Sequence, residues 1–408
     1  MVCRQLPVFN RHMKILLVNQ FFWPDSAPTG QLLTDLAHHL RRGGHEVTVI
    51  CGNSAYAEPD QSAKPDVRII RVGSLPFGRS KVARVVSYLS FLLGLVVRLI
   101  TLKKADLIVT LTTPPLLSPI GTILKGLWGA RHYIWEMDVY PDVAVDLNVL
   151  SSRSWVVRIL GSIIDYSRRR ADGIIALGEC MRQRLIAHGI AADKIAVAEN
   201  WADGRLFYSA AQSSGDSFTV LYSGNLGLAH DIDTIHAAMQ RLKDNSRFHF
   251  IFSGGGPQRL ALEQACDGAR NVSFLPYRSR DELARSFSSA DVGLVTQNAA
   301  CLGSIVPSKV YGLMAAGRPF IFVGPIAATP SRIIERFQCG WRVDCGDSES
   351  LVELLQKLAN SPEMVWVAGR RARQAFLDNY DVHHGVSRIC AILEISGPVE
   401  TFLVSSGS

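Results

Sequence analysis

The sequence predicts an α/β protein made of two doubly wound domains that face each other across a cleft. Short buried strands alternate with helices along almost the whole chain, which is typical of parallel sheets with helical crossovers. The alternation occurs twice, and the polar residues 203–216, which lack an apolar period, separate the two runs. At 408 residues the chain is also too long for one ordinary hydrophobic core.

The first run of elements begins after residues 1–12, which contain no apolar stretch and are predicted to be a loose extension. Met13 opens the first buried strand, and the Gly43-Gly44 pair closes the first helix. We expect strands in this half at 15–18, 47–51, 67–72, 107–111, 133–135, 173–176 and 195–198. We expect helices at 31–42, 82–102, 116–128, 154–168 and 181–188. Residues 13–203 are therefore predicted to form the N-terminal domain.

The second run repeats the pattern and is predicted to form a C-terminal domain over residues 204–380, followed by a helix and tail at 381–408. We expect its strands at 219–222, 248–253, 272–274, 292–295, 320–323 and 341–343. We expect its helices at 232–243, 257–266, 280–288, 310–316, 330–337 and 348–359. Ligands of such sheets bind at the carboxyl ends of the strands.

The composition favours a globular protein with an anionic ligand or surface. The net charge is +7 and the pI is near 9, which suits anionic ligands or an anionic membrane without choosing between them. The eight cysteines contain no CxxC pair and no zinc-type spacing, so we expect reduced thiols in a cytoplasmic protein. We expect no metal, no cofactor and no nucleic-acid partner.

The helix predicted at 82–102 is apolar nearly all round, with Leu92 and Leu95 at its centre. The uncharged stretch 85–97 lies between Arg84 and Arg98, and it is too short to cross a bilayer, which needs about 20 residues. Basic ends around an apolar centre suit a helix that lies on an anionic membrane surface. The alternative is a helix buried between the sheet and its neighbours.

Two segments of the second half indicate a phosphate site. Residues 222–227, Tyr-Ser-Gly-Asn-Leu-Gly, form a strand end that runs into a glycine turn, and residues 307–319 form a loop and short helix that end at Gly317. Unpaired N–H groups and the positive end of a helix dipole favour phosphate at such turns. We therefore predict a diphosphate or nucleotide site, the alternative being ordinary strand-to-helix turns.

Several segments in order resemble family 4 of the retaining GT-B glycosyltransferases, in the branch that builds colanic acid, lipopolysaccharide O-antigen and other exopolysaccharides. These are MKILLVNQFFWPDSAPTG, LAHHLRRGGHEVTVI, VLYSGNLG, FIFSGGGPQRLALE, NVSFLPYRSRDELARSFSSADVGLV and PSKVYGLMAAGRPFI, within residues 13–380. The resemblance implies transfer of a hexose or deoxyhexose from a nucleotide diphosphate sugar to a polyprenyl-diphosphate-linked glycan. It also implies a peripheral enzyme on the inner face of the plasma membrane.

The resemblance implies a donor site in the C-terminal domain. Many relatives carry an Arg and a Lys where Asn225 and His230 stand here, and two glutamates where Ser304 and Gly312 stand. Lys309 is then the replacement cation and a candidate catalytic residue that stabilises the leaving diphosphate; the alternative is a solvated surface lysine. The expected donor-binding residues are Gly224, Asn225, Gly227, Ser308, Lys309 and Tyr277, whose loop contacts the nucleotide base in the family.

The resemblance places the acceptor in the N-terminal domain. Gly30, near the start of the first helix, is the first candidate there, and a plain helix cap by Thr29 is the alternative. The loop 135–142 supplies three carboxylates, Glu136, Asp138 and Asp142. Asp138 is the leading candidate to orient an acceptor hydroxyl or take its proton, the alternative being a solvated loop with one capping aspartate.

Two other functions fit the same scaffold. One is a nucleotide-sugar epimerase, which needs a positioned acid and base beside the donor. The other is a non-catalytic sugar-binding or nucleotide-binding subunit of a polysaccharide assembly, which the missing glutamates and the missing Arg/Lys pair favour.

Overall fold

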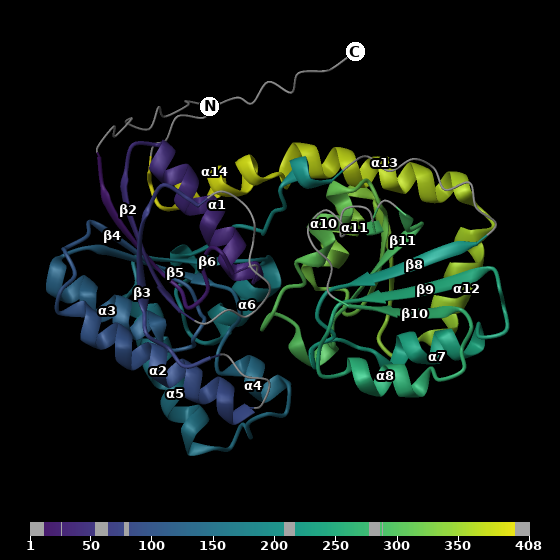
Figure 1. Cartoon of the computed structure of the whole chain (residues 1–408), viewed down its shortest axis with the longest axis horizontal. Coiled ribbons are helices and arrows are strands. Elements are labelled where there is room, and N and C mark those ends of the chain that lie inside the picture. The colour runs from purple at the N-terminus through teal and green to yellow at the C-terminus, as the bar shows by residue number, and fades with distance from the viewer. Residues whose placement is uncertain are drawn as a thin grey trace, which may run out of the picture.

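The computed structural model describes residues 12–25, 27–53, 64–76, 81–207, 217–276, 286–287 and 289–395. It contains two α/β domains side by side, each a parallel sheet with helices on both faces (Figure 1). The N-terminal sheet has the strand order β3-β2-β1-β4-β5-β6-β7, and the C-terminal sheet has the order β10-β9-β8-β11-β12-β13. The predicted fold class, two doubly wound domains, is confirmed.

Side chains alternate across the N-terminal sheet and so build two separate core layers. Ile15 and Leu17 of β1 contact one layer, with helices α1, α6 and α14, whereas Leu16 and Val18 contact the other, with α2 and α3. The strands are β1 Lys14–Val18, β2 Glu46–Gly52, β3 Arg68–Val72, β4 Leu107–Thr110, β5 Arg131–Glu136, β6 Gly173–Ala176 and β7 Ile195–Val197. The helices are α1 Pro28–Arg42, α2 Lys81–Leu99, α3 Leu117–Trp128, α4 Asp142–Asp146, α5 Trp155–Arg170 and α6 Glu179–Ala187.

The C-terminal domain repeats this design with a core rich in aromatic side chains. Its strands are β8 Phe218–Ser223, β9 Phe248–Ser253, β10 Val272–Leu275, β11 Val292–Thr296, β12 Phe320–Val323 and β13 Gly340–Val343. Its helices are α7 Asp233–Arg241, α8 Arg259–Ala265, α10 Lys309–Ala315, α11 Thr329–Phe337, α12 Ser348–Ala359 and α13 Pro362–Asn379. Most of the helix predicted at 280–288 lies outside the described residues.

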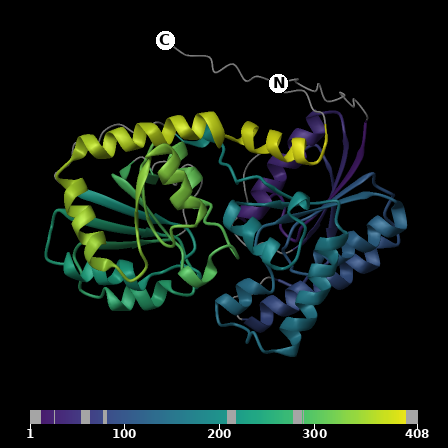
Figure 2. The ribbon, with the colours of Figure 1, turned by 180° about the vertical axis from the view of Figure 1, so that it is seen from behind.

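The chain ends by returning to the first domain. Helix α13, which was not predicted, packs on α10, and α14 (Val382–Ile392) then crosses to the N-terminal domain (Figures 1 and 2). Val386, Ile389 and Leu393 enter the N-terminal core, and Gly385 packs against the ring of Trp201. The two domains are therefore joined by the linker after β7 and also by this returning helix.

Helix α2 is divided lengthwise between core and solvent. Ser87, Phe91 and Leu95 are fully buried, and Leu92 is partly buried against the same core layer, while Leu89 and Leu93 are exposed. The alternative of a buried helix therefore holds for the face that carries Phe91 and Leu95, and the opposite face is exposed. Within the described residues no helix is both long and apolar enough to cross a bilayer.

Candidate functional site

The carboxyl ends of the two sheets meet at the boundary between the domains. The amide of Val139, just after β5, donates to the carbonyl of Ser304, which follows β11, at 2.8 Å. Gly178, after β6, lies against the hydroxyl of Thr329 at the start of α11. The segments that follow the strands of each domain are therefore in direct contact.

The glycine turn after β8 packs backbone to backbone on the turn after β9. Gly224 has φ 121° and Gly254 has φ 127°, and both values favour glycine. A Cβ on Gly254 would lie 2.3 Å from the carbonyl oxygen of Gly224. The amide of Leu226 donates to the carbonyl of Gly255 at 2.7 Å. No helix follows this turn directly, because α7 begins only at Asp233; the expectation of a helix N-terminus at 224–227 is therefore wrong.

The side chain of Lys309 crosses this turn. A Cβ on Gly224 would lie only 2.8 Å from Cε of Lys309, so the absence of a side chain at Gly224 makes room for the lysine. The ammonium donates to the Tyr222 hydroxyl and to the carbonyl of Asn225 at 3.3 Å, and it lies 3.8 Å from the centre of the Tyr222 ring. Burial lowers the pKa of Lys309 well below its usual value. The alternative of a solvated surface lysine is therefore wrong.

His230 completes the surroundings of the ammonium. Its Nδ1 lies 2.7 Å from the carbonyl of Thr296, so Nδ1 carries the proton, and Nε2 faces Nζ of Lys309 at 3.5 Å. Burial, and then the Lys309 charge, lower the pKa of His230 to about 3, so the ring is neutral. In the part of the chain that the structure describes, every partner of the Lys309 ammonium is therefore neutral, and no carboxylate pairs with it.

The remaining donor-side candidates occupy simpler places. Ser308 immediately precedes α10, but its side chain makes no capping hydrogen bond. The carbonyl of Gly227 accepts from the amide of Gln258 at 2.5 Å. Ser304 and Gly312 stand where many relatives of the resembled family carry glutamates, and both lie in the interior. The Ser304 hydroxyl donates to the carbonyl of Cys301, and Gly312 lies against Phe287. Tyr277 lies outside the described residues.

Across the boundary, Asp138 is the carboxylate in the loop after β5. Its amide and that of Met137 both donate to the Thr112 hydroxyl, at 3.2 and 3.1 Å, which holds the start of the loop. Burial, and then the charge of Glu136, raise the pKa of Asp138 to about 6. No hydrogen bond or ion pair to the Asp138 carboxylate occurs among the described residues. Because its pKa is about 6, this carboxyl group can hold or release a proton near neutral pH.

The other two carboxylates of this loop are already paired, so the expectation of a solvated acidic loop is wrong. Glu136 ends β5 and forms a buried ion pair with Arg168 of α5, Nε to Oε1 2.7 Å, with each side chain 1% exposed. Asp142 accepts from Arg184 at 2.6 Å and from His188 at 2.9 Å. Burial alone would raise the pKa of Asp142, but these hydrogen bonds lower it to about 2. Both carboxylates hold elements together.

Arg184 links this cluster to the other domain. Its guanidinium pairs with Asp142 and Asp146, and its Nη1 donates to the carbonyl of Leu302 at 2.9 Å. Gly303 lies against the carbonyl of Cys180. A short loop of the C-terminal domain, residues 299–304, is thus clamped on α4 and α6 of the N-terminal domain. This clamp cannot be predicted from the sequence, since nothing in the spacing of Arg184 relates it to residue 302.

Gly30 lies in the first turn of α1, where a side chain would be tightly packed against backbone. A Cβ there would lie 3.3 Å from the carbonyl oxygen of Asp25 and from a backbone carbon of Phe21. Helix α1 begins at Pro28 with Ala27 as its N-cap, so the alternative of a cap by Thr29 is wrong. The loop before the helix is held instead by Asp25, whose carboxylate accepts from the amide of Ala27 at 2.9 Å.

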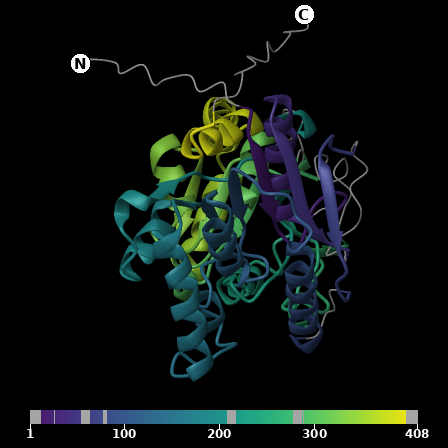
Figure 3. The ribbon, with the colours of Figure 1, turned by 90° about the vertical axis from the view of Figure 1, so that its left-hand side faces the viewer.

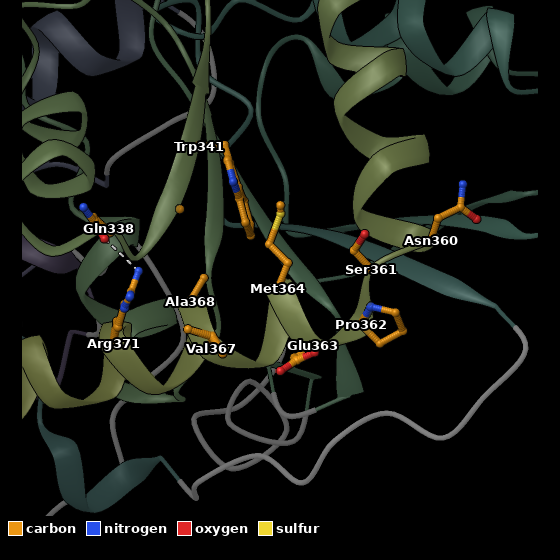
Figure 4. A pocket seen from close by; sticks show the side chains of 11 residues that line it. Gln338, Trp341, Asn360, Ser361, Pro362, Glu363, Met364, Val367, Ala368 and Arg371 are labelled. Carbon is orange, nitrogen blue, oxygen red and sulfur yellow. Dashed lines mark hydrogen bonds between the residues drawn. The ribbon is translucent and has the colours of Figure 1, made fainter.

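A hollow in the C-terminal domain lies away from this site. It is lined by Trp341, Met364 and Arg371, and the Arg371 guanidinium donates to the Gln338 side chain at 2.8 Å (Figure 4). Gly340 and Trp341 begin β13, so the hollow lies at the opposite end of the sheet from the glycine turns. Among the described residues no group of three His, Cys, Asp or Glu side chains is arranged to hold a metal ion.

Each half of the chain matches the model of a known domain family. Residues 29–201 match the glycosyl transferase 4-like domain, and residues 208–375 match the glycosyl transferases group 1 family. The probable glycosyltransferase WbjE of Pseudomonas aeruginosa is 26% identical over 270 residues, 63% of this chain. The alignment spans 66% of WbjE, just under two thirds of its length. The putative colanic acid biosynthesis glycosyl transferase WcaI of Escherichia coli K12 is 24% identical over 352 residues, 80% of this chain and 86% of that protein.

Solved structures show the same fold. HepE of Anabaena, determined in complex with UDP-glucose, superposes with a TM-score of 0.70 at 16% identity, covering 94% of this chain and 100% of HepE. The two-domain architecture is thus the one found in GT-B glycosyltransferases.

Proposed function

We propose that this chain, whose C-terminal half matches the glycosyl transferases group 1 family and which is similar to a putative colanic acid biosynthesis glycosyl transferase, transfers a sugar from a nucleotide diphosphate sugar to a glycan on a polyprenyl diphosphate. One observation carries the donor half of this proposal: the Lys309 ammonium lies at the glycine turn with only neutral partners. A buried cation without a counter-charge is costly. A diphosphate at the turn would supply that charge.

The donor would lie over the glycine turn with its diphosphate against Lys309. That HepE binds UDP-glucose on the same fold supports a nucleotide sugar at this place. As the bond between the anomeric carbon and the diphosphate breaks, negative charge grows on the leaving phosphate. Lys309 stabilises this charge. Diphosphate binding would also raise the pKa of Lys309, because an adjacent anion favours the charged form.

Asp138 would act on the acceptor. Its carboxylate orients the attacking hydroxyl, and the proton of that hydroxyl passes to the leaving phosphate or to Asp138. In a retaining reaction the new bond forms on the face from which the diphosphate leaves, so the leaving phosphate can itself accept the proton. The lipid-linked acceptor is proposed from the relatives that act in surface polysaccharide synthesis.

A binding measurement tests the donor site. Lys309→Met keeps most of the length of the side chain and removes its charge. We expect it to weaken binding of the matching nucleoside diphosphate by about 1.5–3 kcal/mol, or roughly 10- to 150-fold, the scale of a charge-assisted contact. Titration calorimetry with UDP, GDP, dTDP and ADP measures this loss. Lys357→Met, an exposed lysine of α12, is the control and should bind normally. Normal binding by a folded Lys309→Met would remove Lys309 from the site.

A turnover assay separates the transferase from its alternatives. The full chain is incubated with each nucleotide sugar, with and without a polyprenyl-diphosphate-linked glycan. Transfer to the glycan, or slow hydrolysis of the donor alone, supports the proposal. Inversion of a sugar carbon without transfer indicates an epimerase. Tight binding without any turnover indicates a binding subunit, an alternative that the interior positions of Ser304 and Gly312 favour because no glutamate is available there.

A further inference from the structure

We propose that residues 297–309 form a rigid spacer that sets the distance between the loop of Asp138 and the glycine turn, and that Arg184 is the positioning residue that anchors this spacer to the N-terminal domain. The inference rests on the proposed function only for the purpose of this alignment, which is to bring an acceptor hydroxyl to the donor. The contacts that carry it are present in the structure whatever the substrate.

The spacer contacts both halves of the proposed site. At its start, the amide of Asn298 donates to the carbonyl of Ala229 at 2.7 Å, in the segment that follows the glycine turn. Further along, the carbonyl of Ser304 accepts from the amide of Val139 at 2.8 Å, in the loop after β5. The spacer ends at Lys309, the first residue of α10. One short stretch of chain therefore runs from the glycine turn to the acceptor-side loop and back to the ammonium.

The spacer is braced from within. Gln297 is fully buried, and its Nε2 donates to the carbonyls of Cys301 at 2.9 Å and Ile305 at 3.2 Å. The side chain of Asn298 accepts from the amide of Ala300 at 3.0 Å and so caps the short turn between them. A loop whose buried polar groups are paired within the loop opens rarely. The spacer therefore keeps its two ends at a fixed separation.

Arg184 holds the spacer from the other domain. Its Nη1 donates to the carbonyl of Leu302 at 2.9 Å, while Asp142 and Asp146 accept from the rest of the guanidinium at 2.6 and 2.9 Å. A planar guanidinium with three such partners has one orientation, which a lysine ammonium could not reproduce. Gly303 lets the loop approach, because a Cβ there would lie 2.6 Å from a backbone carbonyl oxygen of α6. These contacts fix both the direction and the depth of the spacer.

This anchor lies away from the place where the chain crosses between the domains. The linker and the segment between α13 and α14 cross side by side, since the amide of Ala202 donates to the carbonyl of Tyr380 at 3.2 Å. Figure 3 shows α13 and α14 in yellow along the top of the molecule, and α4, which carries Asp142 and Asp146, lies well below them in Figure 1. A crossing at one place can act as a hinge, so a second contact away from it restricts rotation of one domain against the other.

Such a restriction acts on transfer more than on binding. Reacting atoms must lie about 3–3.5 Å apart, and a misplacement of about 1 Å can cost about 100-fold in rate. The glycine turn and Lys309 both belong to the C-terminal domain, so donor binding needs no alignment of the two domains. Loss of the anchor should therefore impair the step that uses both domains and leave the donor site intact.

Arg184→Met in the full chain removes the anchor, and Arg182→Met is the matched control. Arg182 lies on the same helix with 27% of its side chain exposed, against 23% for Arg184. It contacts Glu179, Ala192 and Ile195, which all belong to the N-terminal domain. The two variants therefore remove the same charge at similar exposure, and only one of them breaks a contact to the spacer.

We expect Arg184→Met to lower the kcat of transfer about 100-fold, and Arg184→Lys to recover part of that loss. The Kd for the nucleoside diphosphate and the slow hydrolysis of the donor without acceptor should stay unchanged. A merely structural defect would lower transfer and hydrolysis together, in proportion to the folded fraction. An unchanged ratio of transfer to hydrolysis in Arg184→Met therefore overturns the role in alignment.

Hydrogen exchange tests the anchor without any catalysis and so separates it from the proposed function. Peptides that contain Val139 and Leu302 should exchange about 10-fold faster in Arg184→Met than in Arg182→Met, as expected when a charge-assisted hydrogen bond is lost. Equal exchange in the two variants overturns the anchor. Faster exchange in a protein whose wild type turns over no donor supports the anchor and contradicts the proposed function alone.

A second variant repeats both measurements from the side of the spacer if Arg184→Met proves unfolded by circular dichroism. Gly303→Ala should push the loop away from α6, because its φ is 79° and the facing group is a backbone carbonyl. Gly346→Ala is the control, since Gly346 also has positive φ (86°) but nothing near its Cβ. Equal exchange and equal transfer in these two variants would again overturn the proposal.

Discussion

Lys309 and Asp138 are both partly buried ionisable side chains that have no oppositely charged partner among the described residues, and each lies on its own side of the domain boundary. Burial favours the neutral form of both groups: it lowers the pKa of Lys309 and raises the pKa of Asp138 to about 6. Paired groups such as Asp142 show the opposite behaviour, with a pKa lowered to about 2 by Arg184 and His188. Unpaired buried charges are therefore the better candidates for function in this molecule.

At the residue scale, the pKa of Asp138 predicts a pH dependence. A carboxylate that orients or deprotonates a hydroxyl must be ionised, so kcat/KM should rise as the pH increases and level off above a midpoint near 6. Asp138→Asn should lower transfer by about 10²–10⁴-fold and remove that midpoint. Asp146→Asn, in the paired cluster nearby, is the control and should keep the midpoint. Near-normal transfer by Asp138→Asn would reduce Asp138 to a loop residue.

At the element scale, the two glycine turns act as one unit. The turns after β8 and β9 touch through their backbones, and Lys309 from α10 lies across the first of them. The geometry of the proposed phosphate site thus depends on positions that make no contact with Lys309. Gly254 is the clearest of these, because its neighbour is a backbone carbonyl that cannot rotate away.

Gly254→Ala should therefore destabilise the C-terminal domain and displace the turn. We expect a loss of about 2–4 kcal/mol in the free energy of unfolding, from the positive φ and the backbone contact together. Urea unfolding measures it. Gly268→Ala is the control, since Gly268 also has positive φ (78°) but nothing near its Cβ, so only about 1 kcal/mol should be lost. Equal losses at the two sites would show that the turns do not need their close contact.

At the scale of the whole molecule, the connections between the domains include the linker, the returning helix α14 and the clamp of loop 299–304 on Arg184. The clamp depends on charges inside the N-terminal domain. His188 contacts Asp142 at 2.9 Å and Asp165 at 3.0 Å, and Asp142 in turn holds Arg184. Hydrogen bonds to the two aspartates raise the pKa of His188 to about 9.

This shift predicts how stability changes with pH. Because the pKa of His188 is higher in the folded than in the unfolded chain, its stabilisation is complete below pH 6.5 and is lost as the pH rises through 9. Wild type should therefore lose about 1–2 kcal/mol more than His188→Gln over this range, after allowance for solvent screening. Urea unfolding of both proteins at pH 6.5 and 9.5 measures the difference. Parallel losses in the two proteins would mean that His188 is neutral in the folded state.

Local sequence determined the elements and the fold class. Strand–helix alternation placed the thirteen strands found in the described residues to within a few positions, because buried parallel strands and amphipathic helices each leave a periodic pattern in nearby residues. The sequence pattern did not predict helix α13. For α2 it predicted the helix, but only the structure showed which face is buried and which is exposed. The residues proposed to bind the donor and the acceptor were chosen because they follow the ends of strands, and their roles remain predictions.

Only the tertiary structure decided which polar groups have partners. Lys309 meets Tyr222 and Asn225, 87 and 84 residues earlier in the chain, and Arg184 meets Leu302, 118 residues later. Glu136 and Asp142 look like Asp138 in the sequence, yet both are ion-paired, while Asp138 has no ion pair with any residue that the structure describes. Burial and pairing depend on contacts between residues far apart in the chain, and these contacts set the electrostatic energies from which function is inferred. Sequence spacing carries no record of them.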